Sequence, residues 1–324
     1  MGSTHARAYH RIEGATLVGV VDPFEKGRAV AAALNVPHYE SVQDVDPSSF
    51  DVVDVCVPTF LHREYVEWAA RMGKNILCEK PIALTLDDAL AMKRICDESG
   101  VRLMIGHCVR FFPEYELAKR KIEQDEIGHV AVARLFRGGG HPATTTWNDW
   151  YANRRLSGGV MVDLMIHDFD FLRWTFGPVT RVFAKSIRDE SNRLGLALVT
   201  LRFRNGTIAH VEGSWAHQGF GTRYEFAGSK GLLAHNSFAV NSLKVERNVP
   251  VMSDNPSVHV PRSPLHKSAY QLEIEDFLDA LKTGREFRVS AEDAREALRI
   301  ALAAVESAES GRPVEMDPIG GRME

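Results

Sequence analysis

Strand-like and helix-like segments alternate along residues 1–106, and this alternation limits the possible folds more than any other feature of the chain. Short runs rich in Val, Leu and Ile are typical of buried strands, and the stretches between them carry apolar residues at helical spacing. The expected strands are 16–21, 51–57, 74–78 and 101–106, and the expected helices are 3–12, 25–34, 60–72 and 86–99. Strands that alternate with helices in this way form a parallel sheet with helices on both faces.

The rhythm changes after Arg110. Asn205-Gly206, a typical hairpin turn, separates two of the strand-like runs that follow. The expected strands are 129–137, 179–187, 195–204, 207–215 and 222–228, and the expected helices are 111–125, 163–176, 266–282 and 291–308. This part of the chain is therefore expected to be an α+β domain with an open, mostly antiparallel sheet. The stretch 248–263, with three prolines, is expected to be an irregular loop.

Composition narrows the class of protein. The chain has 324 residues, of which 44% are hydrophobic and 25% charged, and its net charge is −4. These values suit two globular domains, give no basic surface for nucleic acid, and include no apolar run long enough to span a membrane. The four cysteines lack C-x-x-C spacing and favour a reducing, cytoplasmic environment without a structural metal.

A glycine and an acidic residue near the N-terminus have the spacing of a dinucleotide-binding turn. Such a turn leads from a first strand through G-x-G-x-x-G into a helix, and an acidic residue follows the second strand about twenty positions later. Gly2 and Asp22 match the last glycine and the acid, and Ser3 follows Gly2 at the start of the helix. We therefore expect a Rossmann-type domain over 1–107, and a first strand and first glycines within about ten residues upstream of Met1.

Asp22 bears on the choice of cofactor. Its carboxylate is expected to accept the ribose hydroxyls of NAD and to repel the 2′-phosphate of NADP. Lys26 and Arg28 nearby keep NADP as the less favoured alternative. Asp22 is also a candidate N-cap of the helix 25–34, and the two roles are compatible.

The segment Glu79-Lys80-Pro81 closes the strand-like run 74–78. Open parallel sheets place ligand-binding groups at the carboxyl ends of their strands, so Lys80 is a candidate functional residue. A surface Glu-Lys pair before a rigid turn is the alternative interpretation.

Asp163 and His167 lie four positions apart at the start of an apolar-periodic run. On one helix this spacing places a carboxylate and an imidazole on the same face. An imidazole can exchange a proton near neutral pH, and a neighbouring carboxylate can orient it. Gly158 and Gly159 precede the pair and allow close approach of the backbone to a ligand.

Together these motifs resemble the Gfo/Idh/MocA family, and the resemblance covers nearly the whole chain. The matching segments are Gly2-Ser3-Thr4-His5, Leu17 to Asp22, Val55 to His62, Glu79-Lys80-Pro81, Gly106 to Pro113, and Gly159 to Asp170. The resemblance implies a Rossmann domain, a second domain over 108–324, and late helices that pack back toward the first domain.

The resemblance also implies a chemistry, namely hydride transfer between nicotinamide and a carbinol carbon of a sugar, cyclitol or related polyol. His167 is then the expected base, Asp163 positions it or binds a substrate hydroxyl, and Lys80 hydrogen-bonds the reacting oxygen. Lys80 as the base is an alternative, because a buried lysine can release its proton near neutrality.

Further residues are binding candidates. Those expected at the cofactor are Gly2, Ser3, Asp22, Pro58, Thr59, His62, Glu79 and Lys80, with His5 nearby. Those expected at the substrate are His107, Arg110, Trp147, Asp163 and His167, and Trp150 and Tyr151 are further candidates for an apolar wall against a sugar. Core packing, or a hinge hydrogen bond for His107 and Arg110, is the alternative role. His141 has no expected partner.

Two other functions stay open. One is a glycoside hydrolase of the same family that uses bound NAD transiently, and the other is a silent dinucleotide-binding regulator. Retention of Lys80, Asp163 and His167 argues against the silent protein. An apolar sheet face in the second domain is expected to form a homodimer or homotetramer.

Overall fold

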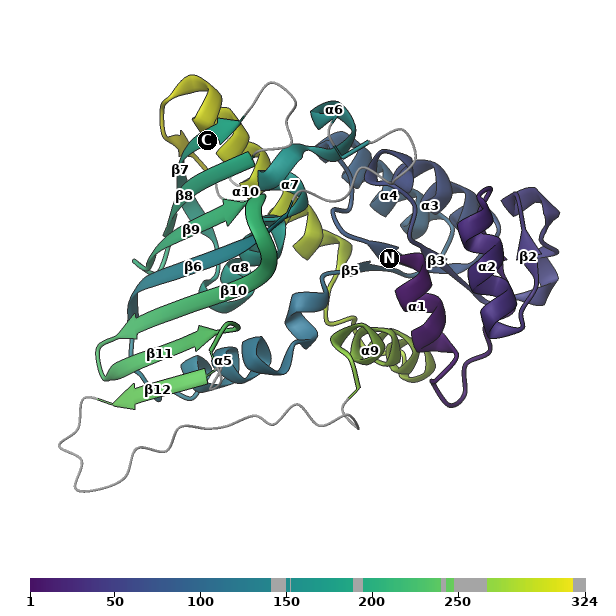
Figure 1. Ribbon diagram of the computed structural model, residues 1–324, viewed down its shortest axis with the longest axis horizontal. Coiled ribbons are helices and arrows are strands. Elements are labelled where there is room, and N and C mark those ends of the chain that lie inside the picture. Colours follow the sequence, from purple (N-terminus) through teal and green to yellow (C-terminus); the bar gives the residue numbers. More distant parts are fainter. Residues whose placement is uncertain (141–149, 152, 189–194, 240–242, 248–266, 317–324) are drawn as a thin grey trace. The chain divides into compact units, whose positions relative to one another are not determined.

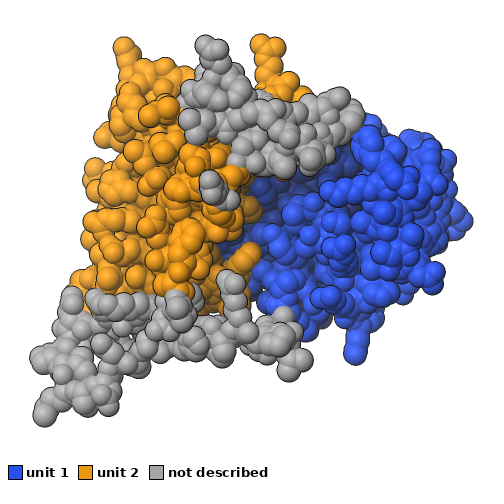
Figure 2. All heavy atoms as spheres, in the orientation of Figure 1, with its two compact units in different colours: residues 1–111, 265–294 blue, residues 112–264, 295–324 orange. Residues whose placement is uncertain are grey.

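The computed structural model describes residues 1–140, 150–151, 153–188, 195–239, 243–247 and 267–316 (Figure 1). They form two compact units, coloured separately in Figure 2. Unit 1 comprises Met1–Phe111 and Leu265–Ala294, and unit 2 comprises Phe112–Pro264 and Arg295–Glu324. Each unit thus combines two chain segments, and the late segment Leu265–Ala294 belongs to unit 1.

Unit 1 contains the parallel strands. The strands are β1 (Val20–Val21), β2 (His38–Tyr39), β3 (Val52–Val55), β4 (Asn75–Glu79) and β5 (Leu103–Gly106). The helices are α1 (Gly2–Tyr9), α2 (Glu25–Leu34), α3 (His62–Arg71), α4 (Leu86–Glu98) and α9 (Ala269–Thr283), with 3-10 turns at Val42–Asp44, Pro47–Ser49, Thr59–Leu61 and Cys108–Phe111. All of the strand pairs in this unit are parallel, as predicted.

The parallel strands belong to two separate sheets, β1-β2 and β3-β4-β5. The predicted strand 16–21 is reduced to the two residues of β1, which pair only with His38 and Tyr39 of β2. The predicted length was wrong because a strand extends only as far as it hydrogen-bonds to a neighbouring strand. Among the described residues, β1 has such a neighbour on one side alone. Strand β2 is too short and too polar to stand out in the sequence.

The centre of unit 1 is β4. Ile76, Leu77 and Cys78 are fully buried, as the continuous apolar run predicts. Helix α4 begins where Thr85 accepts a hydrogen bond from the Asp88 N–H, which satisfies one of the unpaired donors at the helix start. Helix α9 packs against α1 within the same unit.

The described residues of unit 2 are built on one sheet of eight strands. Its helices are α5 (Pro113–Glu123), α6 (Arg154–Ser157), α7 (Gly159–Asp163), α8 (Ile166–Phe176) and α10 (Ala291–Ser310), which begins in unit 1. Its strands are β6 (Val130–Gly140), β7 (Val179–Arg188), β8 (Gly195–Phe203), β9 (Ile208–Ser214), β10 (Ala216–Gly228), β11 (Gly231–Asn236), β12 (Leu243–Arg247) and β13 (Val314–Glu315). The strand order is β12-β11-β10-β6-β9-β8-β7-β13.

This sheet is antiparallel except for the central pair β6–β9, which is parallel. The predicted mostly antiparallel sheet is therefore confirmed. Gly206 of the predicted hairpin turn has φ 94°, a left-handed conformation that glycine adopts without strain. Strands β11, β12 and β13 were not predicted.

The two faces of the large sheet differ. Along β8 buried and more exposed residues alternate, and the buried ones include Val199, Leu201 and Phe203. Phe176 of α8 contacts Phe203 with ring centroids 5.7 Å apart, so α8 covers this face. The opposite face carries Leu198, which is 52% exposed. In the described part of the chain, no helix combines the length and the apolar character that a bilayer crossing requires.

Candidate active site

Glu79 and Lys80 lie where β4 ends, in unit 1. Glu79 is 5% exposed and is the last residue of the strand. Its Oε2 accepts a hydrogen bond from the backbone N–H of Lys80 at 3.1 Å. Burial by itself would raise the pKa of Glu79, but His5 and Lys80 outweigh burial and hold the pKa below its usual range. The carboxylate is thus charged and holds the backbone from which the Lys80 side chain extends.

His62 holds the turn that follows Lys80. Its Nδ1 lies 2.8 Å from the carbonyl oxygen of Pro81, and its Nε2 lies 3.0 Å from that of Val57. Burial lowers the pKa of His62, so the neutral ring donates to one of these carbonyls at a time. The imidazole joins the segment after β3, which includes Pro58 and Thr59, to the segment after β4.

Asp22 follows β1 and precedes α2. Its Oδ1 accepts from the Phe24 N–H at 2.8 Å, and Phe24 rather than Asp22 is the residue that precedes α2 as its cap. The side chain thus stabilises the turn before the helix, and the proposed N-cap role was wrong by two positions. Arg28, the nearest candidate for a 2′-phosphate, pairs with Glu25 and Glu40 at 3.6 and 3.0 Å.

Gly2 and Ser3 open α1, a helix of eight residues. A Cβ added at Gly2 would meet only the Cys56 Cβ, at 3.6 Å, so the space beside it is not tightly closed. The N–H groups of a helix start attract phosphate oxygens. These residues and Asp22 suit the pyrophosphate and ribose of NAD.

His107 and Arg110 are both buried in unit 1. Arg110 Nη1 donates to the carbonyl oxygen of Arg288 at 2.8 Å and lies 3.4 Å from Oδ2 of Asp293. The guanidinium therefore joins the turn after β5 to the chain just before and within the first turn of α10. This supports the hinge interpretation of Arg110 over a substrate contact.

Asp163 and His167 lie in unit 2, on two helices instead of the single predicted helix 163–176. Asp163 is the last residue of α7 and is 8% exposed, and His167 is the second residue of α8 and half-buried. Between them the Met165 N–H donates to the Val160 carbonyl at 2.9 Å, which spans one residue more than an α-helical bond. Such widened turns occur at functional sites, and they change the directions in which side chains point. The four-residue spacing of Asp163 and His167 therefore does not determine how their side chains are placed.

Two consecutive glycines lead into this turn. Gly158 and Gly159 have φ of 75° and 73°, which disfavours other residues. A Cβ added at Gly158 would lie only 2.5 Å from the Val162 Cβ, so any side chain at this position would clash with Val162.

A buried ion pair fixes the start of α8. Asp168, next to His167, is 1% exposed and accepts two hydrogen bonds from Arg137 of β6, at 2.8 and 2.9 Å. Arg137 Nη2 also donates to the Tyr115 hydroxyl at 3.3 Å. Arg137 was not predicted from the sequence, because β6 also contains Arg134, which is exposed, and composition does not distinguish the two arginines.

The aromatic candidates are only partly described. Trp150 and Tyr151 stack with ring centroids 3.9 Å apart, and Trp150 is 8% exposed, as expected of a core residue. Trp147 and His141 lie outside the described residues.

A second buried cluster in unit 1 was not foreseen from the sequence. His5 lies between the carboxylates of Asp54 and Glu79, at 2.9 and 3.1 Å. Glu273 of α9 is fully buried, and its carboxyl has no hydrogen-bond partner among the described residues. Asp54 inside a strand of valines was the available signal. His5, Asp54 and Cys56 are also residue types that bind metal, and their ligand atoms lie within 4.8 Å of one another.

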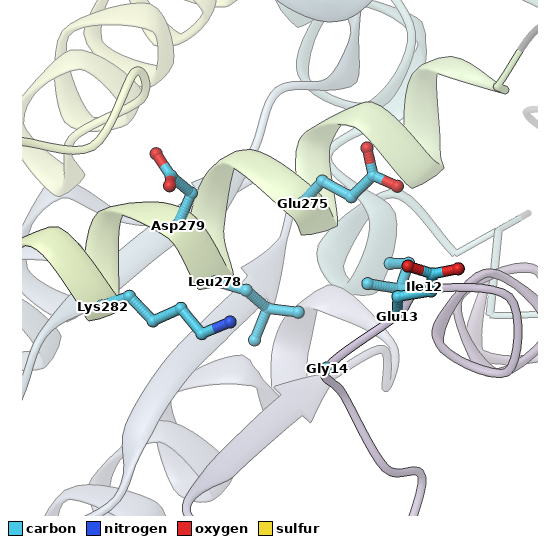
Figure 3. A pocket seen from close by; sticks show the side chains of 7 residues that line it. All are labelled: Ile12, Glu13, Gly14, Glu275, Leu278, Asp279 and Lys282. Atoms are coloured by element: carbon cyan, nitrogen blue, oxygen red, sulfur yellow. The ribbon is translucent and has the colours of Figure 1, made fainter.

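The shallow pocket drawn in Figure 3 lies elsewhere in unit 1. Glu13 and Gly14, after α1, face Glu275, Asp279 and Lys282 of α9 across it. None of the predicted site residues lines this pocket.

Two family models match the chain. One, described as the oxidoreductase family NAD-binding Rossmann fold, matches residues 1–107, and the other, described as the oxidoreductase family C-terminal alpha/beta domain, matches residues 119–316.

Relatives match over nearly the full length. The uncharacterized oxidoreductase YrbE of Bacillus subtilis is 32% identical over 280 residues, which cover 84% of this chain and 80% of that protein. Myo-inositol 2-dehydrogenase of Thermotoga maritima is 30% identical over 341 residues, which cover 99% and 97%. The crystal structure of a myo-inositol dehydrogenase from Corynebacterium glutamicum is 27% identical with a TM-score of 0.79 and covers 98% and 96%.

The chain therefore belongs to the Gfo/Idh/MocA family of oxidoreductases. It is a dehydrogenase that acts on CH–OH groups and uses NAD, which its Rossmann-type domain binds.

Proposed function

We propose that this dehydrogenase oxidises a secondary alcohol of a cyclitol or sugar, with NAD as hydride acceptor. The observation that carries the proposal is a pair of motifs, each of which lies at a turn of the structure. Lys80 follows β4, and Asp163 and His167 lie at the junction of α7 and α8. The similarity to myo-inositol 2-dehydrogenase supports the substrate class.

The proposed roles follow from the chemistry. The reaction removes a proton from a hydroxyl as its carbon loses a hydride, so a base must lie at that oxygen. His167 is the proposed base, and the buried carboxylate of Asp163 orients it or binds a neighbouring hydroxyl. The Lys80 ammonium donates a hydrogen bond to the reacting oxygen and stabilises its negative charge. NAD, when bound, supplies the hydride acceptor.

Other residues are proposed to bind. Gly2, Ser3, Asp22, Pro58, Thr59, His62, Glu79 and Lys80 are proposed to form the cofactor side. NAD is preferred over NADP because Arg28 is already paired with acidic residues. His107, Arg110 and Trp147 stay substrate candidates of lower rank.

The test is net formation of NADH, followed by absorbance, with myo-inositol, scyllo-inositol, aldoses and sugar acids. Lys80→Ala and His167→Ala are expected to lower kcat by at least a hundredfold, far more than they weaken NAD binding, and equal losses in Lys80→Ala would mean a cofactor role instead. His129→Gln, an exposed histidine of unit 2, is the control. Glycoside cleavage without net NADH would favour the hydrolase alternative, and NAD binding without either reaction would favour the regulator.

The assembly is proposed to be a homodimer or homotetramer in the cytoplasm. Support comes from the uncovered face of the large sheet, where Ile187, Leu198 and Ile208 are 68%, 52% and 37% exposed. Light scattering that finds only monomers at micromolar concentration would contradict this part of the proposal.

A further inference from the structure

The His5 ring connects two carboxylates in the core of unit 1. His5 lies on α1 and is 2% exposed. Its Nδ1 is 2.9 Å from Oδ2 of Asp54, and its Nε2 forms an ion pair with Oε1 of Glu79 at 3.1 Å. The Nε2 contact with Glu79 is an ion pair without hydrogen-bond geometry. A lone pair on either ring nitrogen would face a carboxylate oxygen, so the two contacts favour a ring that carries a proton on each nitrogen. The ring is thus a buried positive charge between two negative ones.

The groups around the ring come from every element packed against it. They are Asp54 of β3 and Cys56 just after it, Glu79 and Lys80 at the end of β4, Tyr270 and Glu273 of α9, and Tyr9 of α1. Burial by itself lowers the pKa of His5, but the Asp54 carboxylate more than reverses this and raises the pKa well above its ordinary value. Burial together with Glu79 raises the pKa of Glu273, which is therefore a neutral acid.

Glu79 connects His5 to the backbone of Lys80. One carboxylate oxygen of Glu79 faces His5, and the other accepts the backbone N–H of Lys80 at 3.1 Å. The next residue, Pro81, is held at its carbonyl by His62 at 2.8 Å. The backbone of Lys80 is therefore fixed on both sides by buried side chains.

We propose that His5, as an imidazolium, is a positioning residue that holds Glu79 and, through Glu79, the backbone of Lys80, with Asp54 as its anchor. A reacting group that is oriented by a second residue, itself held by a third, is a recurring arrangement, and here the oriented group is the lysine that donates to the reacting oxygen. The catalytic consequence rests on the proposed function, in which Lys80 contacts the reacting oxygen. The positioning itself does not depend on it.

The positioning is tested by hydrogen exchange of the Lys80 amide, measured by NMR on the full chain. His5→Gln is expected to speed this exchange at least tenfold, because Glu79 loses its partner and its hydrogen bond to Lys80 weakens. Asp54→Asn, which keeps the size of the side chain, is expected to act in the same direction. His10→Gln is the matched control, because His10 directly follows α1 and is exposed.

Unchanged exchange at Lys80 in folded His5→Gln would overturn the proposal. Should His5→Gln not fold, Asp54→Asn decides the question by the same comparison. A stoichiometric zinc ion found in the purified protein by elemental analysis, and lost in Cys56→Ser but not in Cys96→Ser, would also overturn it, because the metal would then replace the proton on Nδ1.

The catalytic consequence is tested with NAD and myo-inositol. His5→Gln is expected to lower kcat about 10- to 100-fold with KM within about threefold, as expected when a reacting group is misplaced. The alkaline limb of kcat against pH should move up in His5→Gln, which removes a positive charge, and down in Glu79→Gln, which removes a negative one. A loss of kcat without these opposite shifts would mean a merely structural role. If Lys80→Ala keeps its kcat, the proposed function of Lys80 fails, while the exchange experiment still decides the positioning.

Discussion

The buried pair Arg137–Asp168 allows a quantitative prediction, because unit 2 contains a matched exposed pair on the same strand. The side chains of Arg137 and Asp168 are 5% and 1% exposed, and two hydrogen bonds of 2.8 and 2.9 Å join them. Arg134, three residues earlier on β6, pairs with Glu225 of β10, where the side chains are 57% and 41% exposed. Solvent screens the second pair and not the first.

Asp168→Ala removes the negative charge and the two hydrogen bonds that Asp168 supplies to the buried guanidinium of Arg137. The expected cost is about 3–5 kcal/mol of unfolding free energy, a large part of a typical total of about 5–15 kcal/mol. Glu225→Ala is expected to cost about 0–1 kcal/mol. Urea denaturation followed by circular dichroism measures both, and the first variant should shift the midpoint by at least about 1 M if the slope is roughly 1–3 kcal/mol/M.

The double variant Arg137→Met with Asp168→Leu separates pairing from burial. It is expected to recover most of the stability, because no charge is then buried. The reasoning is refuted if Asp168→Ala costs no more than Glu225→Ala, or if the double variant is less stable than Asp168→Ala.

Three further predictions concern unit 1. Since the pKa of Glu273 is raised, the folded protein keeps a proton that the unfolded chain releases above about pH 4.5, so stability falls as pH rises; Glu273→Gln should raise the urea midpoint at pH 8 and not at pH 4. Burial raises the pKa of the Cys56 thiol to about 12, so iodoacetamide at pH 8 should label it far more slowly than in urea, and mass spectrometry showing equal rates would contradict this. A Cβ at Gly27 would lie 2.2 Å from the Asp22 Cβ, so Gly27→Ala should weaken calorimetric NAD binding about tenfold, whereas Gly219→Ala should not.

The fold was predictable wherever neighbours in sequence decide it. The apolar run that became β4 and the Asn205-Gly206 turn carry their own signals, and both are present in the structure. Strand β1 could not be delimited, because its length depends on partner strands instead of its own residues. Strand β13 has two residues and is defined only by its pairing with β7.

The same limit applies to the candidate site. Lys80 and Asp163 were found from motifs, but the widened turn before His167 depends on a hydrogen bond that shifts by one residue and leaves no trace in composition. Glu79 was predicted as a cofactor residue, whereas its contacts with His5 and Lys80 could be recognised only after helix α1 had been placed on the strands. Long-range partners of buried charges are set by tertiary packing, which spacing along the chain does not encode.

The parallel pairing of β6 with β9 has a consequence for the order in which the protein folds. The elements α6, α7, α8, β7 and β8 lie between β6 and β9 in the chain, so this whole segment forms a loop that must close when β9 aligns beside β6 in the middle of the sheet. Pairings between segments so far apart in sequence form slowly, because the intervening loop loses entropy before any contact compensates for it. Asp163 and His167 lie inside that loop. Their turn therefore gains its packing only when the centre of the sheet closes, so a chain caught before this step holds the motif residues without the geometry that would make them act together.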